Sequence, residues 1–147
     1  SPRMRLDVSV NLLTMHALSK GKITVFGGDQ IRPNIHIDDI TDLYLHLIDH
    51  PEVTGVYNAG FENISIMDIA KLVTKYVPVE IAVTPSNDPR SYRVNSDKLL
   101  ATGFKPKKTV EDAVREIIEK YRSGVLKDDE HFYNLNWMQK TVLVKQT

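Results

Sequence analysis

Two loops of this 147-residue chain carry arginines in settings that suit the binding of a phosphate group. In the first loop, Gly27 and Gly28 follow a β-branched run, and Arg32 comes directly before Pro33. Glycines let backbone N–H groups approach an anion, and Pro33 favours an extended backbone at Arg32. A guanidinium group held in this way fits two phosphate oxygens at once. A hairpin turn that carries a surface arginine is the alternative interpretation.

The second loop places Arg90 and Arg93 on either side of Tyr92, after a turn-forming Asn-Asp-Pro sequence that contains Asp88. The two guanidinium groups could meet one dianion, and the Tyr92 ring offers a hydroxyl group or a stacking face. Asn11, in an apolar stretch with helical periodicity, could donate its amide to a ligand. The alternatives are a solvated polar loop and an exposed helix residue.

No complete catalytic motif is present in the sequence. G-x-S-x-G, the Walker loop, H-E-x-x-H and G-x-G-x-x-G are all missing. His46 and His50 have a helical spacing that can hold a metal, but no third ligand is specified. We therefore expect two solvated histidines and no metal site. Two arginine-bearing loops without a nucleophile favour binding of a diphosphate over bond-making chemistry.

The composition excludes several other classes of function. With 19 Lys and Arg against 19 Asp and Glu, the net charge is zero, which argues against a dedicated nucleic-acid or membrane-surface binder. No apolar run approaches the roughly 18 residues that cross a membrane. The absence of cysteine rules out disulfides and cysteine–metal sites, and suggests a reducing compartment such as the cytoplasm. The balance of 41% hydrophobic and 26% charged residues is typical of one globular domain, or one lobe of a larger protein.

The hydrophobic pattern predicts a mixed α/β fold with the order α, β, β, α, β, α, β, α, α. Ser65 with Asp68, and Thr109 with Asp112, are capping pairs that mark the start of two helices. The predicted helices run through residues 6–20, 38–50, 65–77, 96–102 and 109–123, and the predicted strands through 23–26, 35–37, 55–60 and 79–84.

Several segments together resemble the C-terminal half of the extended short-chain dehydrogenases/reductases, the NAD(P)-dependent nucleotide-sugar epimerases and dehydratases. Each segment alone is a weak signal, but together they keep the order found in that family. The resemblance covers residues 1–122 and rests on the segments 1–7, 10–11, 25–39, 55–60, 65–70, 92–98, 103–106 and 109–113.

This resemblance implies that Asn11 and Arg32 contact the diphosphate of a nucleotide-diphosphate sugar. It also implies that the loop containing Asp88 and Tyr92 lies near the same ligand. Members of the family carry a phosphate-binding arginine where this chain has Pro85, so we expect Arg90 to act in its place. By the same resemblance, Tyr57 is expected on the last strand of a Rossmann sheet. Asp39 is expected to cap its helix rather than contact the ligand.

Two motifs of the family are missing, namely its glycine-rich N-terminal motif and its catalytic Tyr-x-x-x-Lys. The resemblance therefore predicts a truncated chain, whose missing half holds the Rossmann dinucleotide-binding core and NAD or NADP. Residues 1–124 are expected to be a substrate-binding lobe without catalytic residues, and residues 125–147 a C-terminal arm. Such a lobe should show no turnover alone and should form homo-oligomers or exchange elements. The alternative is a non-catalytic nucleotide-sugar-binding or protein-interaction module.

Overall fold

The computed structural model describes residues 4–142 of the chain. Residues 1–3 of the first matched segment, and residues 143–147 of the predicted arm, lie outside the described residues. The described part is an α/β fold with the elements α1 (Ser9–Lys20), β1 (Lys22–Phe26), β2 (Ile31–Asn34), α2 (Ile37–Asp49), β3 (Glu62–Ser65), α3 (Ile66–Tyr76), β4 (Glu80–Thr84), α4 (Asp97–Leu100), α5 (Val110–Arg122), the 3-10 turn η1 (Glu130–Phe132) and α6 (Asn134–Val142).

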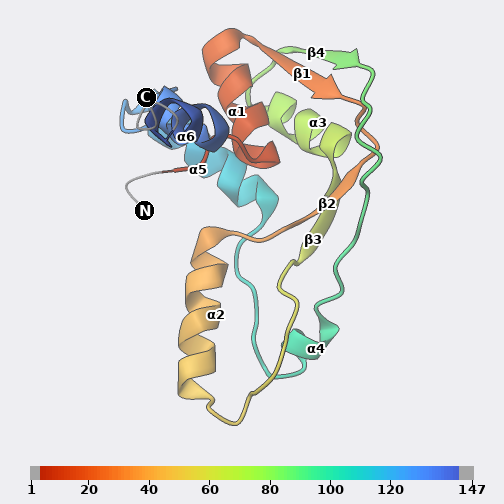
Figure 1. Ribbon diagram of the computed structural model, residues 1–147, viewed down its shortest axis with the longest axis vertical. Coiled ribbons are helices and arrows are strands. Elements are labelled where there is room, and N and C mark those ends of the chain that lie inside the picture. The colour runs from red at the N-terminus through yellow and green to blue at the C-terminus, as the bar shows by residue number, and fades with distance from the viewer. Residues whose placement is uncertain (1–3, 143–147) are drawn as a thin grey trace.

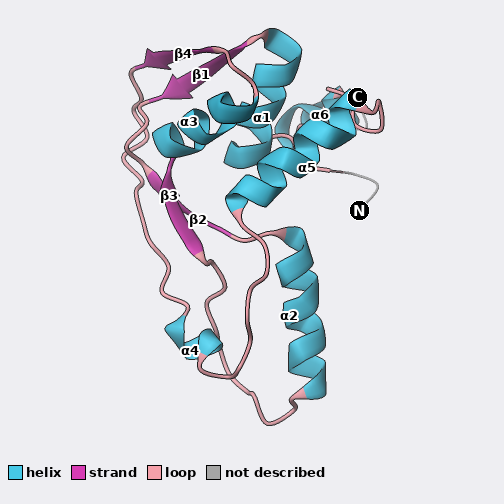
Figure 2. Ribbon diagram, turned by 180° about the vertical axis from the view of Figure 1, so that it is seen from behind, coloured by secondary structure: helices cyan, strands magenta, loops and turns pink. Residues whose placement is uncertain are grey.

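The strands form two small sheets, one at one end of an elongated molecule and the other between its two ends. At one end, β1 pairs in parallel with β4 beside α1 and α3; at the other end lie α2 and α4 (Figure 1). The antiparallel pair of β2 and β3 runs between these ends, as the reverse view also shows (Figure 2). None of the helices within residues 4–142 combines the length and apolarity that a membrane span requires.

The main core lies where α1, α3 and α5 pack against the β1–β4 pair. The apolar stripes of α3 and α5 recur with helical periodicity, so each of these two helices turns one continuous side toward the core, whereas α1 also buries Met15 in a second cluster. Burial of each large apolar side chain contributes about 1.5–3 kcal/mol. The fully buried members of this core, with no measurable exposure, are Ile23, Val25, Ile69, Ala70, Val73 and Val114.

A smaller core holds α2 and α4 together at the other end of the molecule. It is built on Leu43, Leu99 and Phe104, with several partly buried apolar residues around them. The sequence pattern also assigns Ile48 to the buried face of α2, and this is wrong. Ile48 is 73% exposed, because the side of α2 that faces the molecule carries Leu43 and the buried Asp39 instead.

Two predicted strands are absent from the described residues. Residues 35–37 do not form a strand; the strand lies earlier, at β2, where it pairs with β3, and His36 begins α2 as its N-cap. Residues 55–60 also form no strand, and Val56 is 84% exposed. A strand requires a partner, and no strand within residues 4–142 pairs with this segment. The placement of Tyr57 on a strand is therefore wrong for this chain.

The first part of the predicted arm packs against the body of the molecule. Phe132 and Tyr133 contact a cluster that includes Leu6, Met15 and Ile117. The N–H of Leu6 donates a 2.9 Å hydrogen bond to the carbonyl of Phe132. This segment thus ties the beginning of the described chain to the end of α5.

The two predicted capping pairs are confirmed, and the one at Thr109 offers a test of the fold. Thr109 Oγ1 accepts the N–H of Asp112 at 3.1 Å, and the Asp112 carboxylate accepts the N–H of Thr109 at 2.9 Å. Thr109→Ala should remove about 1 kcal/mol of stability, because the backbone N–H of Asp112 at the start of α5 loses its side-chain acceptor. A melting curve should show a decrease of about 2–4 °C.

The matched control is Thr109→Ser, which keeps the hydroxyl group and should melt close to the wild type. Equal melting temperatures for the wild type and Thr109→Ala would show that this capping box adds nothing to the stability of α5.

Candidate functional site

The two arginine-bearing loops meet around one carboxylate, that of Asp88. Arg90 grips it in a fork, with Nε 2.7 Å from Oδ1 and Nη2 2.8 Å from Oδ2. Arg32, on β2, approaches from the other loop and places Nη2 3.3 Å from the same Oδ2. Arg32 Nη1 also donates to the carbonyl oxygen of Arg90 at 2.5 Å. We call Arg32, Asp88 and Arg90 the arginine cluster.

The loop after β4 is held to the edge of β2 by Ser91 and Tyr92. The N–H of Ile31 donates to Ser91 Oγ at 3.0 Å, and the N–H of Tyr92 donates to the carbonyl of Ile31 at 3.3 Å. These bonds place the Tyr92 ring 5.3 Å from the guanidinium carbon of Arg32, a cation–π distance. Sequence reasoning did not anticipate the anchoring role of Ser91.

The electrostatics of the arginine cluster favour the charged form of Asp88. Hydrogen bonds from the side chain and the backbone N–H of Arg90 hold the pKa of Asp88 well below its usual range, and the charge of Arg32 adds to this effect. The same contact raises the pKa of Arg90. Two cations and one carboxylate leave the cluster with a net charge of +1. The Arg90 side chain is 77% exposed, so the cluster is open to a further anion.

Asn11 is not part of this cluster in the described structure. It is half-buried on α1, and its side-chain amide donates to the carbonyl of Arg5 at 2.7 Å. The glycine turn after β1 also differs from the prediction. The N–H of Gly28 donates to Gln30 Oε1 at 2.8 Å, so this group is used within the turn. A glutamine two residues after the glycines is the sequence signal that was missed.

A hollow of about 520 Å³ lies along the chain after the second loop, between the segments around residues 60–63 and 93–97. Asn63 fixes one wall, because its side chain exchanges hydrogen bonds of 2.8 and 3.0 Å with the backbone of Val94. Ser96 fixes another, since its hydroxyl bonds to both backbone groups of Gly60. Ser96 precedes α4 as predicted, but its side chain joins two segments instead of capping the helix. Arg93 lines this hollow.

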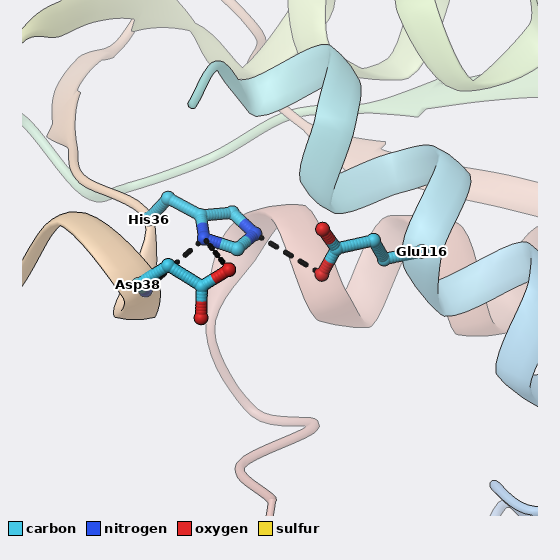
Figure 3. Close-up of side chains that lie close together, drawn as sticks. All are labelled: His36, Asp38 and Glu116. Carbon is cyan, nitrogen blue, oxygen red and sulfur yellow. Dashed lines mark hydrogen bonds and ion pairs between the residues drawn. The ribbon is translucent and has the colours of Figure 1, made fainter. Parts of the chain in front are cut away.

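The side chains of His36, Asp38 and Glu116 come together between α2 and α5 (Figure 3). His36 Nδ1 accepts the N–H of Asp38 at 3.2 Å, and His36 Nε2 lies 3.3 Å from Glu116 Oε2. Three such ligand atoms could hold a metal ion in principle. However, the Lys108 ammonium lies 2.8 Å from Glu116 and 3.9 Å from Asp38, so a cation already balances both carboxylates. The group is best explained as an ion-pair network that joins the two helices.

Asp39 has a different role from the predicted helix cap. Its carboxylate is almost fully buried and accepts the backbone N–H groups of Lys107, at 2.9 Å, and Lys108, at 3.2 Å. It therefore fixes the segment before α5 against α2. His46 and His50 are also engaged: His46 Nε2 lies 3.1 Å from Thr102 Oγ1, and His50 Nδ1 lies 2.8 Å from the His46 carbonyl. These histidines are partly buried rather than solvated.

Most of the chain matches known proteins in sequence and in fold. No model of a known protein family matches it. Over 131 residues it is 27% identical to dTDP-glucose 4,6-dehydratase 1 of Escherichia coli strain K12, covering 78% of this chain and 36% of that protein. The fold matches TunA, an NAD-dependent NDP-hexosamine 5,6-dehydratase involved in tunicamycin biosynthesis, with a TM-score of 0.71 and 23% identity, over 81% of this chain and 41% of TunA. This chain is related to the extended short-chain dehydrogenases/reductases.

The relationship to extended short-chain dehydrogenases/reductases confirms the predicted resemblance and the α/β fold class. A further match is UDP-glucose 4-epimerase of Thermotoga maritima, solved with UDP-glucose, with a TM-score of 0.67 and 20% identity, over 81% of this chain and 40% of that chain. The chain thus spans about a third of the length of the Escherichia coli dehydratase and two-fifths of these structures.

The contact between Arg90 and Asp88 can be tested by titration. Arg90→Gln should raise the pKa of Asp88 toward its ordinary value of 3.8, because the side-chain hydrogen bonds of Arg90 that favour the carboxylate are lost. Carbon-13 NMR of the Asp88 carboxyl measures this shift. Since the folded-state pKa lies below the unfolded one, the contact stabilises the fold above the unfolded pKa and is lost as the pH falls through the folded pKa.

Arg93→Gln is the control, because it removes the same charge from the same loop without touching Asp88. The pKa of Asp88 in the Arg93→Gln variant should equal that in the wild type. An equal upward shift in both variants would mean that the overall charge, and not the Arg90 contact, sets the pKa of Asp88.

Proposed function

We propose that the arginine cluster, with Tyr92 beside it, binds the diphosphate of a nucleotide-diphosphate sugar. The observation that supports this is the convergence of Arg32 and Arg90 on one anion, the Asp88 carboxylate. Phosphate oxygens offer the same paired acceptors that a carboxylate offers, and arginine forks fit both. Hydrogen bonds between charged groups are stronger than those between neutral groups, so a few such bonds would hold the ligand.

Other parts of this binding site are also proposed from the residues. Tyr92 is half exposed and offers a ring face or a hydroxyl group to the ligand. Asn11 is a further proposed contact, for which its amide would have to exchange the Arg5 carbonyl for a phosphate oxygen. The E. coli and T. maritima relatives carry nucleotide sugars in their names or structures, which supports this class of ligand.

We propose further that the chain is the substrate-binding part, residues 1–124, of an NAD(P)-dependent epimerase or dehydratase, with 125–147 as its arm. NAD or NADP would supply hydride transfer, but this sequence has neither a dinucleotide-binding glycine motif nor Tyr-x-x-x-Lys. The cofactor therefore does not fit the residues of this chain, and we assign it to another part of the enzyme. The chain's own contribution would be to orient the sugar by holding its diphosphate.

The surface of α2 supports docking of such a further part. Ile37, Tyr44, Leu45 and Ile48 recur with helical spacing on one side of α2, and each is more than half exposed, between 56% and 73%. An apolar helix face of this kind marks a protein contact. Since the chain matches only 36% of the dehydratase and 41% of TunA, we propose that the remaining part of the enzyme covers this face.

Loss of Arg32 tests the proposed ligand site. Arg32→Ala should weaken binding of nucleotide-diphosphate sugars by about 10- to 100-fold, because a charged contact to the diphosphate is lost. Calorimetric titration of the chain with a panel of these sugars measures the effect, and the chain alone should convert none of them.

Arg122→Ala serves as the control, since it removes an equally charged, exposed side chain from the end of α5. It should bind like the wild type. Unchanged affinity in a folded Arg32→Ala variant would exclude Arg32 from the site. Turnover by this chain would contradict the proposal that it binds the substrate while another part of the enzyme holds the cofactor.

The α2 face yields a separate prediction for the isolated chain. Ile48→Lys should reduce self-association, because a charge then replaces an apolar contact on a face that copies of the chain would otherwise cover with each other. Sedimentation velocity measures the change. Asp49→Lys introduces a lysine beside this face on the same helix and should leave self-association nearly unchanged. Identical sedimentation of all three proteins as associated species would mean that α2 is not the contact.

A further inference from the structure

We propose that Asp88 is an internal competitor, whose carboxylate takes the place of the diphosphate until a ligand displaces it. This inference rests on the proposed function of the arginine cluster. It adds that the cluster is already filled by an anion of the protein's own. Binding would then exchange the Asp88 carboxylate for the anionic group of a ligand. To displace the carboxylate, the ligand would need more negative charge than the single charge of Asp88.

The geometry of the contact is that of an anion bound between two arginines. Arg90 binds both carboxylate oxygens in a fork, at 2.7 and 2.8 Å, and Arg32 reaches one of them at 3.3 Å. This is the paired arrangement in which arginine also binds phosphate. The N–H groups that would meet the ligand are therefore the ones that the Asp88 carboxylate uses.

Asp88 can leave this position without disturbing the rest of the structure. It belongs to the irregular loop after β4, and its side chain is one-third exposed. The anchors of the loop on β2 are Ser91 and Tyr92, and neither bond involves Asp88. Rotation of the Asp88 side chain would break its ion pairs with Arg32 and Arg90 and the 3.1 Å hydrogen bond that it accepts from the backbone N–H of Arg90, while the loop remains attached through Ser91 and Tyr92.

Arg32 would stay oriented after the exchange. Its Nη1 donates to the carbonyl oxygens of Ile31, at 3.0 Å, and Arg90, at 2.5 Å, and the Tyr92 ring lies over its guanidinium group. These neutral partners do not depend on the Asp88 carboxylate. A ligand would thus meet a preformed arginine, which lowers the entropy that binding has to overcome.

The charges decide which ligands can displace Asp88. With its carboxylate in place the cluster carries +1, and with the carboxylate turned away it carries +2. A diphosphate brings at least two negative charges against the one of Asp88, so Coulomb attraction favours the exchange. A ligand with one negative charge has no such advantage. The internal carboxylate would therefore reserve the cluster for diphosphates and similar polyanions.

A competitor and a supporting residue make opposite predictions. If Asp88 only positioned the two arginines, its removal would lower both the stability of the protein and its affinity for an anion. If Asp88 competes, its removal lowers stability, because ion pairs are lost, but raises affinity, because nothing has to be displaced. The two measurements together separate these roles.

Inorganic pyrophosphate is a suitable probe, because it needs neither the base nor the sugar of the natural ligand. Asp88→Asn should bind pyrophosphate roughly 5- to 20-fold more tightly than the wild type in calorimetric titration. Without ligand, the same variant should melt at a lower temperature. Asp88→Glu keeps the charge and should bind close to the wild type.

The matched control is Asp7→Asn. Asp7 pairs with Arg5 two residues earlier through Arg5 Nε at 2.9 Å, so this change removes a similar ion pair and the same charge elsewhere. Its pyrophosphate affinity should equal that of the wild type. An affinity of Asp88→Asn no greater than that of Asp7→Asn would overturn the inference. Equal pyrophosphate binding by the wild type and Arg32→Ala, or no binding by any variant, would overturn the proposed function itself.

Discussion

The site depends on the way Ile31 uses its two backbone groups. In an antiparallel pair, alternate residues direct their N–H and C=O groups to opposite edges. Ile31 directs its N–H and C=O groups away from β3, toward Ser91 and Tyr92. Two residues further along the same edge, Pro33 has no N–H to offer, so this pairing cannot continue through it. These bonds therefore fix the loop after β4 beside Ile31, and there Arg90 of the loop meets Arg32 of β2.

The attachment of α2 to α5 and to the segment before it is a second constraint, and it is polar. The buried carboxylate of Asp39 holds the backbone before α5, and His36 lies against Glu116 of α5. Buried polar groups of this kind specify one arrangement, because each loses its partner if the helix shifts. The opposite side of α2 is apolar and exposed. The contacts on one side therefore fix the position of the helix, while the other side is accessible to a partner.

Local features of the fold followed from the sequence, and features that depend on distant partners did not. The capping pair of Thr109 and Asp112 spans three residues, and its prediction is confirmed. The predicted strand at 55–60 is wrong because the composition of a segment cannot supply the second strand that it has to pair with. The two arginine loops were predicted from the residues, but their convergence on one site followed only from the family resemblance, because Arg32 and Arg90 are 58 positions apart. The buried role of Asp39 had no signal within its own helix.

The most direct test of the account is a crystal structure of this chain with the tightest-binding nucleotide-diphosphate sugar of a panel. The account predicts phosphate oxygens between the guanidinium groups of Arg32 and Arg90, with the Asp88 carboxylate turned out of the cluster. A sugar nucleotide bound elsewhere, for example in the hollow beside Asn63, with Asp88 still held by both arginines, would contradict it.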